Sequence, residues 1–78
     1  MKAHNGRMVK ILRAIGGKKD KGALKSAIVG WSIRELGVSG ASVRNYLADA
    51  MDAVYIEDRS GFLFLTPDGE DFLAKAGA

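Results

Sequence analysis

Residues 33–47 read Ile-Arg-Glu-Leu-Gly-Val-Ser-Gly-Ala-Ser-Val-Arg-Asn-Tyr-Leu, and this stretch decides the fold. Gly37 supplies a tight turn, because glycine adopts backbone angles that other residues avoid. Ser39 is typical of a helix N-cap, where its hydroxyl accepts a hydrogen bond from an otherwise unpaired backbone N–H. Apolar side chains then recur at positions 43, 47, 50 and 54, which predicts a helix over about 39–53 with one buried face.

Two helices are predicted before this turn. Apolar residues at positions 8, 11, 12 and 15 predict a first helix over about 4–15, which Gly16–Gly17 ends. The next segment ends at Leu36–Gly37 and carries two apolar stripes, one at positions 24, 27, 28 and 31 and the other at 29, 33 and 36. Both stripes cannot face a single core. We therefore expect either a break near Gly30, which is unfavourable inside a helix, or one helix that is apolar on two sides.

The periodicity changes after residue 53. Residues 54–57, Val-Tyr-Ile-Glu, and 62–65, Phe-Leu-Phe-Leu, are short strand-like runs. They flank the turn cluster Asp58-Arg59-Ser60-Gly61, which predicts a β-hairpin with a four-residue connection. Thr66–Pro67 is typical of a helix start, and acidic residues at 68, 70 and 71 suit the positive end of that helix. Its expected apolar face is Phe72, Leu73 and Ala76.

Charge divides the chain into two unequal parts. Residues 1–47 hold ten basic and two acidic side chains, a net charge of +8. Residues 48–78 hold two basic and seven acidic side chains, a net charge of −5, so the whole chain carries +3. This asymmetry suggests one face suited to a polyanion and another turned away from it. The alternative is that both parts are charged for solubility and that the split is chance.

Length and composition bound the function. The 78 residues predict a single domain over 1–78, with a thin core that dimerisation would help to stabilise. No apolar run approaches the ~20 residues that span a bilayer, and the first residues lack the apolar core of a signal peptide, so a cytoplasmic protein is expected. With no Cys, one His and no glycine-rich phosphate loop, the sequence predicts no enzyme, metal site or cofactor.

Two segments carry a resemblance to a known family. They are residues 33–47, with an apolar residue, a turn glycine, a cap serine and a buried valine, and residues 64–69, Phe-Leu-Thr-Pro-Asp-Gly. In this order they resemble the winged helix-turn-helix family of DNA-binding regulators. The resemblance implies a mainly α fold with a small β-hairpin, in which a three-helix core is followed by the wing and a C-terminal helix. It also implies that the helix over about 39–53 lies in the DNA major groove.

The chemistry of this helix suits base reading. Small residues at positions 40–42 permit close approach, and amides at the helix N-terminus can bind a phosphate. Arg44 can pair with guanine and Asn45 with adenine. Ser39 and Ser42 are expected to contact the DNA backbone and so position the protein on it without specifying sequence. The expected DNA-binding residues are Ser39, Gly40, Ala41, Ser42, Arg44, Asn45, Arg34, Lys25, Lys18, Lys19, Lys21 and Arg59.

The favoured interpretation is thus sequence-specific binding of double-stranded DNA by a small transcriptional regulator. A homodimer is one expected form, and no small-molecule effector is expected. Contacts to several phosphates would give a log–log salt dependence of roughly −4 to −8. The alternative is a winged-helix protein-interaction module, since one fold hosts both roles and the expected wing carries a single base, Arg59. A phage-type accessory or RNA-binding protein is a third possibility.

Overall fold

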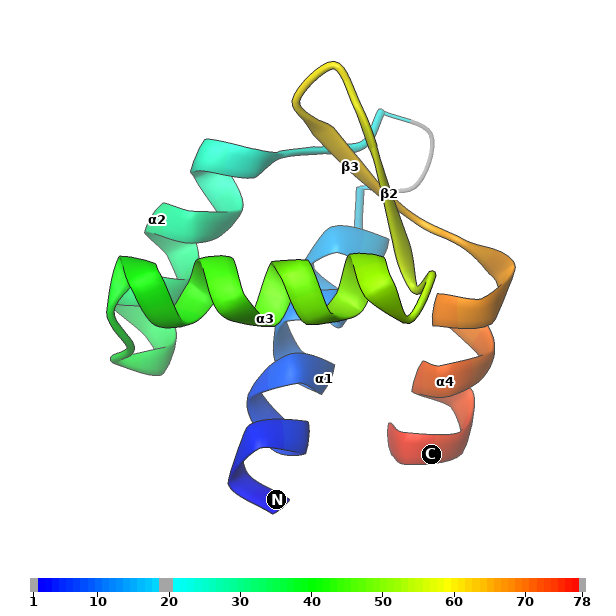
Figure 1. Cartoon of the computed structure of the whole chain (residues 1–78), viewed down its shortest axis with the longest axis horizontal. Coiled ribbons are helices and arrows are strands. Elements are labelled where there is room, and N and C mark those ends of the chain that lie inside the picture. The colour runs from blue at the N-terminus through cyan, green and yellow to red at the C-terminus, as the bar shows by residue number, and fades with distance from the viewer. Residues whose placement is uncertain (1, 19–20, 78) are drawn as a thin grey trace.

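The computed structural model describes residues 2–18 and 21–77, which form four helices and three short strands (Figure 1). The elements in chain order are α1 (Lys2–Gly16), β1 (Ala23–Leu24), α2 (Lys25–Leu36), α3 (Gly40–Asp52), β2 (Ile56–Arg59), β3 (Phe62–Leu65) and α4 (Pro67–Gly77). The prediction of a mainly helical chain with a β-hairpin before the last helix is therefore confirmed.

The sheet contains a strand that the sequence analysis missed. It is antiparallel, with the strand order β1-β3-β2, so that β3 lies in the middle. The additional strand, β1, pairs Ala23 with Leu63 and Leu24 with Phe62. Leu24 was expected on the face of the following helix. Two residues are too few to show the alternation by which strands are recognised, so tertiary pairing with β3 defines this strand.

The hairpin is tighter than predicted. Arg59 pairs directly with Phe62, which leaves only Ser60 and Gly61 in the connection. Both have positive φ angles, 55° and 91°, as in the type I′ turns that favour two-residue hairpins. The predicted four-residue connection is therefore wrong, because Asp58 and Arg59 belong to β2.

Val54 is placed differently from both predictions made for it. It neither ends the buried face of α3 nor begins the strand: its φ angle is 63° and 56% of its surface is exposed. The helix ends at Asp52, and the backbone N–H of Val54 bonds to the carbonyl oxygen of Met51. The carbonyl oxygen of Val54 accepts a hydrogen bond from the Thr66 hydroxyl. The chain thus reverses at Val54 before β2 begins at Ile56.

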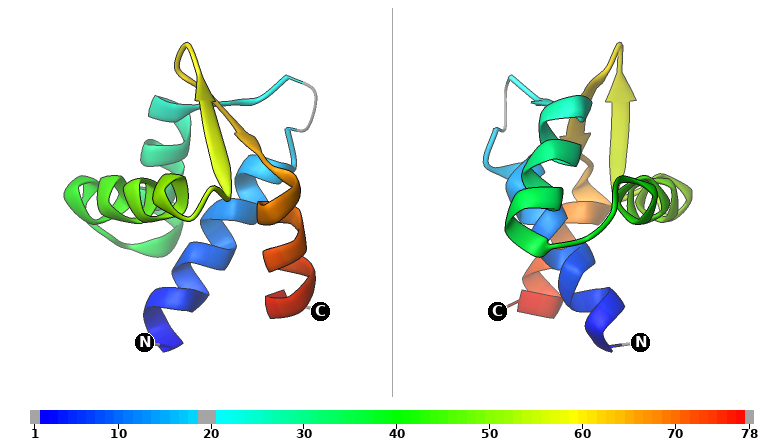
Figure 2. Two further views of the ribbon diagram at one scale, coloured as in Figure 1. Left: turned by 45° about the vertical axis from the view of Figure 1, so that its right-hand side comes forward. Right: turned by 90° about the vertical axis from the view of Figure 1, so that its left-hand side faces the viewer.

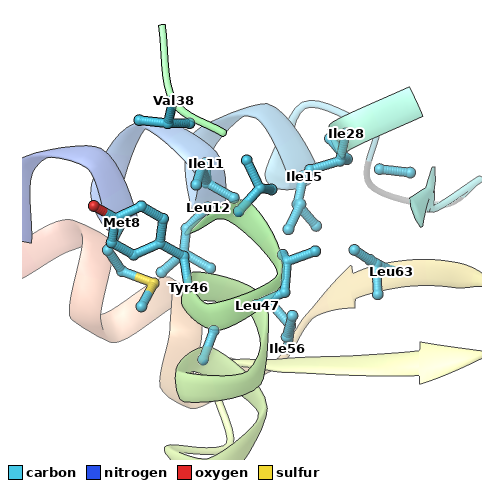
Figure 3. Packing of buried hydrophobic residues seen from close by; sticks show 13 residues of the cluster. Met8, Ile11, Leu12, Ile15, Ile28, Val38, Tyr46, Leu47, Ile56 and Leu63 are labelled. Atoms are coloured by element: carbon cyan, nitrogen blue, oxygen red, sulfur yellow. The ribbon is translucent and has the colours of Figure 1, made fainter. Parts of the chain in front are cut away.

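The core lies between α1, α3 and the sheet (Figure 3). The expected stripe on α1 is confirmed, since its four side chains are buried. They pack with Tyr46 and Leu47 of α3, Ile56 of β2 and Leu63 of β3. The buried residues of α1 are Met8, Ile11, Leu12 and Ile15. This packing holds α3 across the front of the molecule in Figure 1.

Helix α4 begins as predicted, but its apolar face contains fewer residues than predicted. The Thr66 hydroxyl accepts a hydrogen bond from the N–H of Gly69 at 3.0 Å, and Pro67 occupies the first helical position. Phe72 stacks on Tyr55, with ring centroids 4.5 Å apart. Ala76, however, is exposed, because the last turn of α4 points away from the sheet (Figure 1). Its apolar face therefore consists of Phe72 and Leu73.

Helix α2 resolves the conflict between its two apolar stripes. It continues through Gly30 without a break, so the alternative of one helix that is apolar on two sides is confirmed. The stripe at positions 29, 33 and 36 lies on the side of α3: Val29 and Leu36 pack on the core. Of the other stripe only Ile28 is buried; Ala27 is exposed and Trp31 half-buried. One apolar side of α2 is thus left uncovered.

Candidate nucleic-acid interface

The turn between α2 and α3 has the predicted local geometry. Gly37 ends α2 in the left-handed conformation, with φ 66°. Ser39 caps α3: its Oγ accepts a hydrogen bond from the Ser42 N–H at 3.1 Å. The Ser39 hydroxyl also bonds to the Ser42 hydroxyl, at 3.1 Å. These bonds fix the angle at which α3 leaves the turn.

The accessible side of α3 carries the α3 residues that were predicted to meet DNA. Val43, Tyr46, Leu47 and Ala50 are buried on one side of the helix. Ala41, Arg44 and Asn45 are exposed on the other, while Gly40 and Ser42 are partly exposed. The structure thus brings Ser39 and five residues of α3 together as one surface, which we call the α3 face. Its members are Ser39, Gly40, Ala41, Ser42, Arg44 and Asn45.

Arg44 is the cation of the α3 face. Its Nη1 lies 3.7 Å from the position that a Cβ atom on Gly40 would occupy, so the side chain lies along the first turn of the helix. Its guanidinium forms no ion pair with any carboxylate of the described residues. Arg44 therefore extends toward the N-terminal end of α3, where backbone N–H groups add positive potential.

Asp49 was not among the predicted site residues. Together with Ser42, Asn45, Tyr46 and Ala48, this residue lines a shallow hollow of 450 Å³ on α3. Its spacing of four residues from Asn45 places both on one side of a helix, and that spacing was the available signal. A carboxylate here makes the surface mixed in charge. In a major groove, such a group can accept a hydrogen bond from the amino group of cytosine.

The other predicted cations divide into two groups. Lys18, Lys21 and Arg34 line a groove on the uncovered apolar side of α2. In the right-hand view of Figure 2, α2 lies between α3 and the described cyan segment that leads into β1, so this groove does not continue the α3 face. Lys25, at the start of α2, lies beside the hairpin, because its N–H bonds to the carbonyl oxygen of Gly61 at 2.9 Å. Lys19 lies outside the described residues.

Arg59 of the hairpin is engaged with its own strands. Its Nε donates to the Glu57 carboxylate at 2.8 Å, and its guanidinium carbon lies 4.5 Å from the centroid of the Phe64 ring. The hydrogen bond from Arg59, and then its positive charge, hold the pKa of the Glu57 carboxyl below its ordinary value of 4.5. The same bond raises the pKa of Arg59. With Asp58 beside this pair, the hairpin carries one negative charge overall.

The Glu57–Arg59 pair predicts a pH dependence. A lowered carboxyl pKa in the folded state means that the pair contributes stability above the pKa of Glu57 in the unfolded chain. This contribution is lost as the pH falls through the folded pKa, and it is small because both groups are exposed. An NMR titration of the Glu57 side chain should therefore give a pKa below 4.5 that returns to 4.5 in Arg59→Gln. An unchanged pKa in that variant would contradict the pairing.

The described residues contain no group of three His, Cys, Asp or Glu side chains placed to hold a metal ion. None of the described helices combines the length and the apolar character that crossing a membrane requires. The chain matches no family model, no curated protein and no solved structure.

Proposed function

We propose that the chain is a winged helix-turn-helix protein that binds double-stranded DNA, with α3 in the major groove. The order α1, β1, α2, α3 and then the β2–β3 hairpin supports this assignment. So does the three-residue connection between α2 and α3, which contains a glycine, as helix-turn-helix units do. In this proposal the hairpin is the wing. The observation that carries the function is the α3 face, which presents an arginine and an asparagine on an otherwise small-residue surface.

The dimensions of α3 suit a major groove. Its 13 residues make a helix about 20 Å long at 1.5 Å per residue. The groove, about 12 Å wide, admits a single helix. Because the residues nearest the turn are glycine, alanine and serine, the N-terminal end of α3 can approach the base edges closely. The N-terminal end is also where recognition helices make their base contacts.

Two side chains of the α3 face have complementary reading chemistry. Arg44 can donate two hydrogen bonds to guanine, and Asn45 can pair with adenine. Ser39 and Ser42, together with the first N–H groups of α3, suit phosphate contacts that set the register without specifying sequence. The function that follows is sequence-specific DNA binding, as in a small transcriptional regulator.

A homodimer would extend the site. Base readout by one short helix covers few base pairs, and dimeric helix-turn-helix proteins bind two half-sites about one helical turn apart. A dimer remains a prediction for this chain, and light scattering of the free protein would test it.

The hairpin favours a second candidate function, a protein-interaction module. Its single cation is neutralised by Glu57, and Asp58 adds a further carboxylate. A hairpin of this charge does not attract a phosphate backbone. Under this alternative, the exposed residues of α3 would contact a protein, and Arg44 would make no contribution to DNA affinity.

Substitution of Arg44 distinguishes the two functions. Arg44→Ala should weaken binding to a preferred duplex at least fivefold, because a base-paired arginine contributes about 1–3 kcal/mol. The matched control is Arg7→Ala, which removes an exposed cation of α1 and should change the affinity less than twofold. Fluorescence anisotropy with labelled duplex gives both affinities.

Backbone amide shifts supply the second readout. Addition of duplex should shift the NMR signals of residues 39–49 most strongly. If no duplex perturbs these residues, or if Arg44→Ala behaves like Arg7→Ala, DNA binding through α3 is wrong and the protein-interaction alternative gains support.

A further inference from the structure

The uncovered side of α2 forms one wall of a groove of 740 Å³. Ala27, Trp31 and Arg34 of α2 line it, and the sheet contributes Leu24 and Phe62. Leu24 and Phe62 are paired in register, and each keeps more than two fifths of its surface exposed, 45% and 42%. These residues form a continuous apolar surface, rather than single exposed side chains, because they meet across two elements. Surfaces of this kind mark binding sites.

The sequence pattern shows that this surface is not part of the core. The stripe that runs through positions 24, 27, 28 and 31 conflicted with the second stripe on α2, and of its members only Ile28 is buried. Ser32, between the two stripes, is buried and donates to the carbonyl oxygen of Ile28 at 2.8 Å. The core therefore already occupies the side of α2 that faces inward. The apolar side chains at 24, 27 and 31 face the groove instead.

The size of the groove indicates a small ligand. From Ala27 to Arg34 the helix advances about 10 Å, which is two turns. An amphipathic partner helix anchored at i to i+7 spans the same length, so the length admits either occupant. The volume of 740 Å³ lies within the range of about 300–1,000 Å³ typical of small-molecule sites.

The charge at the groove indicates an anion. Lys18, Lys21 and Arg34 line it, and no carboxylate of the described residues does. Arg34 projects from the body of α2, and its Nη1 lies 3.5 Å from the position that a Cβ atom on Gly30 would occupy. A guanidinium pairs with a carboxylate through two parallel hydrogen bonds, which makes arginine well suited to this group.

We propose that this groove binds a small amphipathic carboxylate, with its apolar body on Trp31, Ala27 and Phe62 and its carboxylate on Arg34. The lysines at positions 18 and 21 add positive potential along the groove. The site lies on the opposite side of α2 from the α3 face, so it neither requires DNA binding nor competes with it. A result that refutes one of the two proposals does not affect the other.

Trp31 reports on the groove directly, because it is the only tryptophan of the chain. We would titrate the full chain with 4-phenylbutyrate and follow the emission of Trp31 at constant ionic strength. A saturable blue shift is expected as the apolar body excludes water from the indole. The alcohol 4-phenylbutanol has the same apolar body without the charge, and should bind at least fivefold more weakly.

Three variants localise the binding. Arg34→Gln should lower the affinity for 4-phenylbutyrate at least fivefold and change the affinity for 4-phenylbutanol less than twofold, because only the carboxylate loses its partner. The matched Arg7→Gln should change neither. Ala27→Phe fills the groove at an exposed position and should weaken both ligands at least fivefold, with an unchanged circular dichroism spectrum.

Each remaining outcome would overturn the proposal. They are the absence of a saturable shift, equal binding of acid and alcohol, or an effect of Arg34→Gln no larger than that of Arg7→Gln. A blue shift that appears on raising the protein concentration alone would assign the groove to a second copy of the chain. Binding of an acidic peptide without binding of 4-phenylbutyrate would assign it to a protein partner.

Discussion

Replacement of Leu63 by alanine should remove about 2–5 kcal/mol from the free energy of unfolding, because it leaves a cavity in a packed core. Leu63 is fully buried at the centre of β3, the middle strand, with Ala23 on one side and Asp58 on the other. The total free energy of unfolding expected for a chain of 78 residues is only roughly 4–12 kcal/mol. The substitution is therefore expected to remove a large part of the total stability.

Urea denaturation followed by circular dichroism measures this effect. The matched control is Met51→Ala, which truncates a side chain of similar size that is 42% exposed on α3. It should change the free energy of unfolding by less than about 0.5 kcal/mol, as most surface substitutions do. If the two variants lose equal stability, Leu63 does not occupy the centre of the core.

Salt should weaken DNA binding by an amount that reveals which cations touch the DNA. Each phosphate contact contributes about −0.9 to the log–log slope. Arg59 is paired with Glu57 and is therefore not counted. If only Arg44 and Lys25 make contacts, the slope is about −2, and raising salt from about 50 to 200 mM lowers the affinity roughly 12-fold. If the three cations of the groove contact DNA as well, the slope is about −4.5 and the loss is about 500-fold.

The structure favours the shallower of the two slopes. Lys18, Lys21 and Arg34 lie on the other side of α2 from the α3 face, so a slope of about −2 is expected, shallower than the range inferred from the sequence. Affinities measured at four or more salt concentrations give the slope. A slope of about −4.5 or steeper would contradict this placement, and a slope near zero would contradict DNA binding as a whole.

The sequence predicts the elements that local signals define. The stripe from Met8 to Ile15, the cap at Ser39 and the Thr66–Pro67 start each specify a helix within a few residues, and all three helices are present. The predictions fail where pairing between distant segments decides the outcome. Strand β1 exists because Ala23 and Leu24 meet β3, and residues 58 and 59 belong to β2 because they pair with residues 63 and 62.

The candidate site shows the same division. The residues of the α3 face share one helix, so their spacing already predicts that they lie together. The remaining cations are spread over residues 18–59, and spacing alone does not show which side of the molecule each occupies. Arg34 illustrates the difficulty, since the helical segment that contains it is apolar on two sides. Only the packing of α2 against α3 shows that Arg34 lines the groove.

The order of the strands leaves β2 at the edge of the sheet, with one row of backbone groups that no strand within residues 2–18 and 21–77 pairs. Such an edge can recruit a strand from a neighbouring molecule and begin aggregation. Three of the four residues of β2 are charged, Glu57, Asp58 and Arg59. Each β2 edge carries one net negative charge, so two such edges repel each other, and the opposite edge, β1, is only two residues long. The protein is thereby expected to remain dispersed at high concentration despite its small core.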